Sequence, residues 1–194
     1  MKLSTFCYSV LVVSSSEKFN SSVLNLLPEN RYSPVTVAAD AASARRLLLE
    51  TGFDIVIINT PLTDDFGTRL AIDICESSPT GILLLVKAEH YADINARVSP
   101  YGVLSVSKPT SAQMITQSLN LLCGTRERLR RMEQKAASIE EKMQEIRIVN
   151  RAKWLLIEQL GMTEKEAHRY IEKQAMDQCV TRRIISENII STYK

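Results

Sequence analysis

The fold is decided by a short stretch in the N-terminal half of the chain, Asp54-Ile55-Val56-Ile57-Ile58-Asn59. Four consecutive β-branched residues without polar alternation are typical of a strand that is buried on both faces of a parallel sheet. Comparable apolar runs stand at residues 8–13, 35–38, 82–86 and 102–106. Segments of helical character separate them, at about residues 18–27, 41–51, 69–77 and 91–99. This alternation predicts a doubly wound α/β domain with a five-stranded parallel sheet and with sites at the carboxyl ends of the strands.

Composition and charge limit the class of protein. Of the 194 residues, 45% are hydrophobic and 24% are charged, which is typical of an ordinary soluble protein with room for one large or two small domains. Residues 1–121 carry a net charge of −2 and residues 122–194 a net charge of +4, which favours a polyanionic partner at the C-terminal end. No segment approaches the roughly 20 apolar residues of a membrane span. We therefore expect no membrane partner and a cytoplasmic location.

The residue types that carry metal or acid–base chemistry are sparse. The four cysteines, at positions 7, 75, 123 and 179, form no Cys-x-x-Cys pair, and only two histidines accompany them. This pattern excludes the familiar zinc spacings and provides no disulfide framework, so a reducing compartment is the simplest interpretation. No paired acid and base, nucleophile–histidine arrangement or glycine-rich phosphate loop is present. We expect no enzyme activity, no metal and no cofactor.

Two helices are predicted in residues 150–177, NRAKWLLIEQLGMTEKEAHRYIEKQAMD. The first is expected to end at Gly161, because glycine readily adopts the left-handed conformation that closes a helix. Thr163 and Glu166 then match a capping box, in which each side chain accepts a hydrogen bond from the other residue's amide. A last helix over about residues 181–192 carries an isoleucine stripe that would complete a three-helix bundle.

The apolar and aromatic residues of this region are assigned to its core. The second helix is expected to turn four residues inward, namely Ala167, Tyr170, Ile171 and Met176. Tyr170 and Trp154 could each stack on a nucleotide base. Because both stand at helical spacing with aliphatic neighbours, packing in the core is the favoured role.

These helices resemble the ANTAR domain, a small three-helix RNA-binding module of bacterial transcription antiterminators. The resemblance lies in Arg151-Ala152-Lys153, Leu155-Leu156, Gly161-Met162-Thr163-Glu164, Glu166-Ala167 and Ala175-Met176. The chain departs from the family pattern at Trp154, usually Gly, at His168, usually Phe or Tyr, and at Glu172, often Arg. The resemblance implies binding to RNA hairpin loops. The residues expected to contact RNA are Arg151, Lys153, Lys165, Arg169, Lys173, Arg182 and Arg183.

Residues 5–121 resemble the receiver domain of two-component response regulators. The likeness lies in Asp54, Asn59 and Gly67 around the third strand and in Lys108-Pro109 after the fifth. The positions that carry receiver chemistry differ. The acidic pair falls on Ser14 and Ser15, and the phosphoacceptor aspartate falls on Asn59.

These replacements remove the chemistry of phosphoryl transfer. An amide is not a usable nucleophile, and neutral serines offer a divalent cation almost no negative charge. We therefore expect a pseudo-receiver with a degenerate phosphorylation site formed by Ser14, Ser15, Asn59 and Lys108, in which Lys108 donates hydrogen bonds to Asn59 or to loop carbonyls. An unrelated flavodoxin-like domain is the alternative.

A heptad pattern links the two regions. Position a holds Leu122, Leu129, Ala136, Met143 and Asn150, and position d holds Thr125, Met132, Ile139 and Ile146. Complementary charges occupy the flanking g and e positions, in the pairs Arg128 with Glu133 and Lys135 with Glu140. The pattern predicts a parallel coiled-coil homodimer through residues 122–150. A long helix that packs back on its own domain is the alternative.

Three parts are thus expected: a pseudo-receiver (residues 1–121), a coiled-coil linker helix (122–149) and an ANTAR RNA-binding domain (150–194). The predicted function is transcription antitermination by a dimer that binds hairpin loops in nascent transcripts, without control by aspartyl phosphorylation. The alternative function is a phosphorylation-independent protein-interaction module. In that case the pseudo-receiver binds a regulatory protein partner, and the helices serve only dimerisation.

Overall fold

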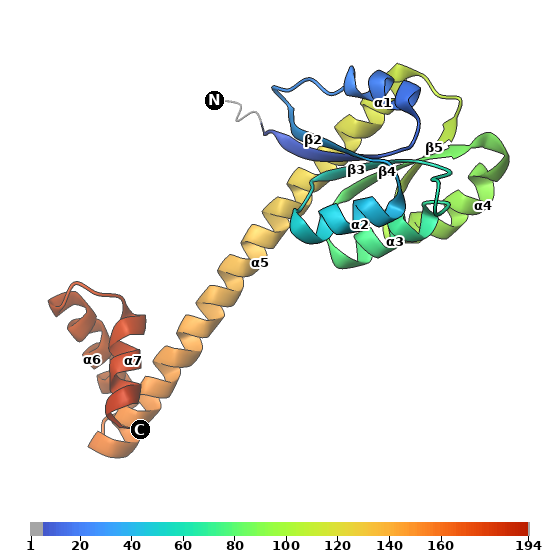
Figure 1. Ribbon diagram of the computed structural model, residues 1–194. Coiled ribbons are helices and arrows are strands. Elements are labelled where there is room, and N and C mark those ends of the chain that lie inside the picture. The colour runs from blue at the N-terminus through green and yellow to red at the C-terminus, as the bar shows by residue number, and fades with distance from the viewer. Residues whose placement is uncertain (1–5, 194) are drawn as a thin grey trace. The chain divides into compact units, whose positions relative to one another are not determined.

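The computed structural model describes residues 6–193 of the chain (Figure 1). Contacts divide the chain into two compact units, Met1–Arg130 and Arg131–Lys194. One continuous helix, α5 (Ala112–Leu160), contributes residues to both units. In the described part of the chain, no helix combines the length and the apolar character needed to cross a membrane.

The first unit is built on a parallel sheet of five strands, which confirms the predicted fold class. The strands are β1 (Tyr8–Val13), β2 (Tyr32–Ala38), β3 (Ile55–Asn59), β4 (Gly81–Lys87) and β5 (Leu104–Lys108). Their spatial order is β2-β1-β3-β4-β5. After β2 is placed on one side of β1, the later strands are added on the other side, so the topological switch point lies between β1 and β3. The last strand ends two residues later than its apolar pattern predicts, because Lys108 still pairs with Lys87 of β4.

Helices cover both faces of this sheet (Figure 1). One face is covered by α2 (Ala41–Glu50), α3 (Thr68–Ser77) and α4 (Ala88–Val98), and a short 3₁₀ helix, η1 (Ser99–Tyr101), follows α4. The other face is covered by α1 (Glu17–Leu24) and the first turns of α5. Because successive side chains of a strand point to opposite faces, Val56 and Ile58 enter the first core while Ile55 and Ile57 enter the second.

The first turns of α5 correct one prediction about the coiled coil. Leu122, expected to open the dimer seam, is only 6% exposed and belongs to the core between the sheet and α5, together with Cys123. It lies against Gly81 at the start of β4, where an added Cβ would come within 3.4 Å of the Leu122 side chain. Leu122 therefore packs in the core of the first unit and is not part of an exposed dimer seam.

A charged cluster ties the start of β3 to α5 within the first unit. The Asp54 carboxylate accepts hydrogen bonds from the amide of Ser9 at 3.1 Å and from its hydroxyl at 3.2 Å. It also accepts from Arg130 Nη2 at 2.9 Å and lies 3.4 Å from Arg126 Nε. The three charged side chains are 14–30% exposed. Arg130 also lies 3.0 Å from Glu127. Removal of Asp54 would take one negative charge from between two poorly solvated arginines, which is costly.

We expect Asp54→Ala to destabilise the first unit by about 2–4 kcal/mol, somewhat below the value for a fully buried pair. The measurement is amide hydrogen exchange of β1 and β3, which reports the local free energy of opening. Asp73→Ala is the matched control, because Asp73 pairs with Arg45 where both side chains are more than 40% exposed. That exposed pair should contribute less than about 1 kcal/mol. Equal effects of the two variants would contradict a stabilising role for the Asp54 cluster.

The second unit packs the end of α5 against α6 (Glu164–Asp177) and α7 (Arg182–Thr192). Its core consists of Ala152, Leu156, Ala167, Ile171, Ala175, Ile185 and Ile189. Gly161 has φ +65°, as its predicted role at the end of α5 requires. The capping box is confirmed: Thr163 N donates to the Glu166 carboxylate at 2.8 Å, and Glu166 N donates to the Thr163 hydroxyl at 3.3 Å.

The predicted inward face of α6 was wrong at two of four positions. Ala167 and Ile171 are buried, but Met176 is 78% exposed and Tyr170 is 39% exposed. Ala175 takes the inner position instead, because the buried residues follow each other at intervals of four, about one turn of the helix. The structure thus leaves two large side chains on the surface of α6.

Candidate nucleic-acid interface and receiver-type site

The outer face of α6 is basic. Lys165, Arg169 and Lys173 are exposed and repeat at intervals of four, as do the buried residues Ala167 and Ile171. The two series are two residues apart, which is about 200° around an α-helix, so they occupy opposite faces. None of these three cations forms an ion pair with a carboxylate of residues 6–193. The face is therefore positively charged and solvated, which suits contact with phosphates.

Three of the predicted RNA contacts are engaged inside the second unit instead. Lys153 Nζ lies 2.8 Å from Glu164 Oε1, and its side chain is only 16% exposed. This hydrogen bond, together with the lysine's charge, lowers the pKa of Glu164. Arg183 Nε pairs with Glu187 at 2.9 Å, one turn further along α7. Arg182 lies 3.8 Å from Glu145 and 3.9 Å from Glu172.

These contacts give Glu172 a role that its sequence position did not reveal. The Glu172 carboxylate lies 3.2 Å from His168 Nε2 and near Arg182 on α7. Its negative charge is thus directed at His168 and Arg182 of the same unit. A cavity of about 440 Å³ opens beside this group, and its walls include Lys142, Glu145, Lys153, His168 and Arg182. Lys153 and Arg182 are paired with carboxylates there.

The assignment of Trp154 to the core was wrong. Its side chain is 71% exposed. The physical reason is its position midway between Ala152 and Leu156, which are both buried at an interval of four, so that Trp154 points to the opposite side of α5. Arg151, three residues earlier, is exposed on the same side. An exposed indole beside an arginine is a suitable platform for stacking an unpaired base.

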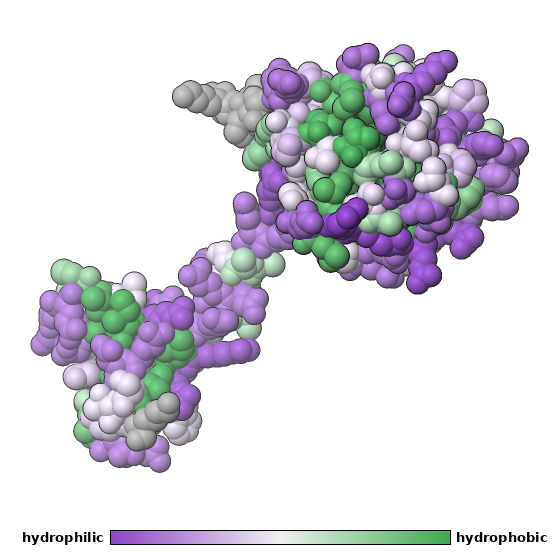
Figure 2. All heavy atoms as spheres, in the orientation of Figure 1, coloured by the Kyte–Doolittle hydropathy of each residue, from purple (hydrophilic) through white to green (hydrophobic). Residues whose placement is uncertain are grey.

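An apolar stripe also runs along α5 in the second unit. Met132, Ile139, Met143 and Ile146 are each 50–59% exposed, although all are large and apolar. They occupy the predicted a and d positions of the heptad. On the face of the molecule shown in Figure 2, apolar patches of the second unit are surrounded by hydrophilic side chains. Such a row of exposed apolar residues is typical of a surface that a partner helix covers.

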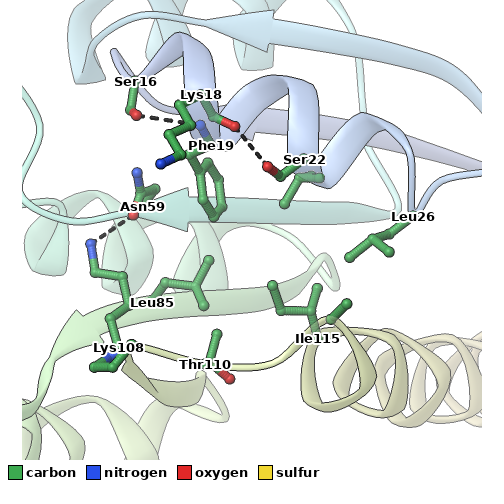
Figure 3. Close-up of a pocket in the computed structure, with 13 residues that line it drawn as sticks. Ser16, Lys18, Phe19, Ser22, Leu26, Asn59, Leu85, Lys108, Thr110 and Ile115 are labelled. Atoms are coloured by element: carbon green, nitrogen blue, oxygen red, sulfur yellow. Dashed lines mark hydrogen bonds between the residues drawn. The ribbon is translucent and has the colours of Figure 1, made fainter.

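At the carboxyl edge of the sheet, three of the four residues of the predicted degenerate phosphorylation site form a chain of hydrogen bonds, and Figure 3 shows the bond between Lys108 and Asn59. Lys108 Nζ donates to Asn59 Oδ1 at 2.7 Å and to the carbonyl of Thr60, which confirms the bonds expected for this lysine. Asn59 Nδ2 in turn donates to Ser14 Oγ at 3.0 Å. Ser14 is buried, whereas its neighbour Ser15 is exposed and forms no hydrogen bond with Ser14, Asn59 or Lys108. Every acceptor bonded to Lys108 is neutral.

The nearest loop carboxylates do not replace the missing acids. Asp64 accepts 2.9 Å hydrogen bonds from the amides of Ala41 and Ala42 at the start of α2, and these bonds lower the pKa of its carboxyl group. Asp65 accepts from the amide of Gly67. Among residues 6–193, no group of three or more His, Cys, Asp or Glu side chains is arranged to hold a metal ion.

Comparisons with known proteins agree with this division. The family model for the ANTAR domain matches residues 137–190, which cover most of the second unit. The chain is 26% identical over 184 residues to the transcriptional regulatory protein PdtaR of Mycobacterium tuberculosis, over 94% of this chain and 89% of PdtaR.

The first unit matches solved receiver domains. The receiver domain of an HD domain-containing protein from Pseudomonas fluorescens has a TM-score of 0.59 and 23% identity, over 68% of this chain and 96% of that domain. The non-phosphorylated HemR receiver domain of Leptospira biflexa has a TM-score of 0.53 and 23% identity, over 59% and 92%. At these identities the likeness establishes the fold. The chain therefore carries an ANTAR domain at residues 137–190, and a unit of the receiver fold precedes it.

Proposed function

We propose that this protein regulates transcription by antitermination: as a dimer, it binds hairpin loops in nascent transcripts in the cytoplasm. The observation that carries the proposal is the ANTAR match at residues 137–190, which falls on a bundle with a solvated basic face. Lys165, Arg169 and Lys173 supply that face, and Arg151 lies beside the exposed Trp154. Unstacked loop bases are recognised by such combinations of cations and stacking side chains. The relative PdtaR is itself a transcriptional regulatory protein by name.

Lys153, Arg182 and Arg183 have a secondary place in this proposal. Each already has a carboxylate partner within the second unit, so a phosphate would have to compete with that carboxylate. Arg182 and Lys153 line the same cavity, together with Lys142 and Glu145. We therefore assign the main phosphate contacts to the unpaired cations of α6, namely Lys165, Arg169 and Lys173. Lys153, Arg182 and Arg183 are assigned secondary contacts.

Salt-dependent binding tests RNA binding against the alternative function. A pool of hairpin RNAs with randomised loops is incubated with the full chain, and bound hairpins are selected and titrated at increasing salt. Neutralisation of several phosphates requires the affinity to fall linearly with salt on logarithmic axes. If no hairpin binds at any salt concentration, the protein-interaction module is the better account, with a regulatory protein bound to the receiver-fold unit.

Dimerisation is proposed through residues 122–150, with the partner helix covering the apolar stripe of α5. The exposed Met132, Ile139, Met143 and Ile146 supply the seam, and Lys135 and Glu140 supply complementary charges beside it. Leu122 is excluded from that seam because it is buried in the first unit. A dimer presents two basic bundles to two neighbouring hairpins, which raises affinity through effective concentration.

We further propose that aspartyl phosphorylation does not control the protein. Acetyl phosphate with Mg²⁺ is expected to leave the full chain without a phosphoryl adduct in intact-mass spectra, because Asn59 has no nucleophilic carboxylate and Lys108 is bonded to neutral acceptors. Asn59→Asp alone should also remain unlabelled, since Ser14 and Ser15 still provide no charge for the metal. The matched positive control is the triple variant Ser14→Asp, Ser15→Asp, Asn59→Asp. A stable adduct on the unmodified chain would contradict the proposal.

A further inference from the structure

The receiver-fold unit contains a cavity that neither RNA binding nor the hydrogen-bonded site explains. It has a volume of about 440 Å³ and lies between α1 and the segment that leads from β5 into α5 (Figure 3). Apolar side chains from both sides form most of its wall, among them Phe19, Leu26, Leu85 and Ile115. The volume lies within the range of pockets that hold small organic ligands, and such pockets are mostly apolar with a few polar groups that fix orientation.

The polar groups of this cavity are mainly positive or neutral. Lys18 and Lys108 both line it, and Asn59 lies between them in Figure 3. Within residues 6–193, neither lysine forms an ion pair with a carboxylate, and the acceptors bonded to Lys108 are an amide oxygen and a backbone carbonyl. Burial, and after it the charge of Lys87, lower the pKa of the Lys108 ammonium group. A positive charge is therefore held in a partly desolvated place without a counter-charge.

We propose that this cavity binds a small organic carboxylate with an apolar body, such as an aryl-substituted or branched aliphatic acid. The carboxylate would accept hydrogen bonds from Lys108 and Lys18, and the body would lie against Phe19, Leu85 and Ile115. A phosphate dianion fits less well, because no arginine lines the cavity to bind it in a bidentate manner and most of the wall is apolar.

The position of the cavity makes such a ligand an alternative input for the unit. The ligand would touch Asn59 and Lys108, which stand at the receiver-type site, and also Ala112 and Ile115 in the first turns of α5. Its binding would stabilise the folded first unit by mass action, since the cavity exists only when α1, β4 and α5 are packed together. The proposal concerns the first unit alone and does not depend on RNA binding.

The test is a titration of the full chain with three probes, followed by NMR of its isoleucine and leucine methyl groups. The probes are 2-naphthylacetate, its neutral amide 2-naphthylacetamide, and acetate. We expect 2-naphthylacetate to shift the Ile115 and Leu85 methyl signals with a dissociation constant on the order of 1 mM or tighter. The amide should bind at least about tenfold more weakly, because it lacks the charge-assisted hydrogen bonds. Acetate should bind more weakly still, because it lacks the apolar body.

Variants locate the site. Ser22→Trp fills the cavity from an exposed position of α1, where the Ser22 hydroxyl bonds only to its own helix, and should abolish binding of both naphthyl probes. Lys108→Gln should remove the preference for the acid over the amide. Lys18→Gln should reduce that preference, and it serves as the second variant if Lys108→Gln lowers stability, because Lys18 is exposed on α1. Arg97→Gln is the matched control, because it removes one positive charge from an exposed position of α4 that does not line the cavity.

Three results would overturn the proposal. The first is the absence of methyl shifts with 2-naphthylacetate at millimolar concentration. The second is equal binding of acid and amide, since the ligand would then be recognised without its charge. The third is unchanged binding in Ser22→Trp, since the ligand would then bind elsewhere.

Discussion

Replacement of Lys165, Arg169 and Lys173 together by alanine is expected to lower the affinity for a selected hairpin RNA about a hundredfold, with no loss of folding stability. The three side chains are exposed on the face of α6 opposite the buried Ala167 and Ile171, so their removal leaves the core untouched. If each contacts one phosphate, the slope of log affinity against log salt should fall by about 2, since each phosphate of a single strand contributes roughly 0.7. The measurement is a fluorescence-anisotropy titration at several salt concentrations.

The matched control removes the same charge from the other unit. Arg46, Arg69 and Arg97 are exposed on the helices of the receiver-fold unit, and their joint replacement by alanine lowers the net charge equally. This control should bind the hairpin with nearly unchanged affinity and slope, because only charges at the interface release counterions. If both triple variants lose affinity to the same extent, RNA attraction is a property of net charge, and α6 is not the RNA-binding face.

Ile139→Asp combined with Ile146→Asp is expected to weaken the homodimer at least about a thousandfold. Both side chains are 59% exposed in the single chain, so the substitution should not disturb the fold of the second unit. In a coiled coil, each would be buried and contribute about 1.5–3 kcal/mol, and two are lost from each of the two chains. The measurement is sedimentation equilibrium of the full chain over a range of concentrations.

The same variant separates dimerisation from RNA recognition. Binding to a single hairpin should be nearly unchanged, whereas the extra affinity for an RNA with two adjacent hairpins should be lost. Ser138→Asp with Gln144→Asp is the matched control, because these exposed residues occupy outer heptad positions and introduce the same charge. If the Ile139/Ile146 variant sediments like the wild-type protein, α5 is not the dimer interface. If the control also dissociates, the effect is one of charge.

The sequence predicted the first unit closely because its signals are local and redundant. Runs such as residues 55–58 lack polar alternation, which only a strand covered on both faces can satisfy, and the structure buries all four. The capping box at Thr163 and Glu166 was equally predictable, since both bonds close within one turn of the chain. The hydrogen bond from Lys108 to Asn59 followed from the expectation that both residues stand at the carboxyl edge of the sheet.

The candidate RNA interface was less predictable, because helical spacing identifies faces without saying what covers them. Trp154, Tyr170 and Met176 have aliphatic neighbours at helical spacing and were assigned to the core, yet all three are on the surface. Counting from the small buried residues would have found this, since Ala152, Ala167 and Ala175 mark the inner faces of α5 and α6. Small residues permit close helix packing. Hydrophobicity, by contrast, ranks the larger neighbouring side chains above alanine as candidates for the core.

By itself, the sequence determined the parallel α/β class, the order of the helical segments and the absence of acids at Ser14, Ser15 and Asn59, because these depend on residue types and on spacing within single elements. Only the tertiary structure decided that Leu122 belongs to the receiver core, that Lys153 and Glu172 have partners within their own unit, and that Trp154 is exposed. Those outcomes depend on which surfaces meet. The burial and pairing of a side chain are set by neighbours distant in sequence, and a helical period leaves those neighbours undetermined.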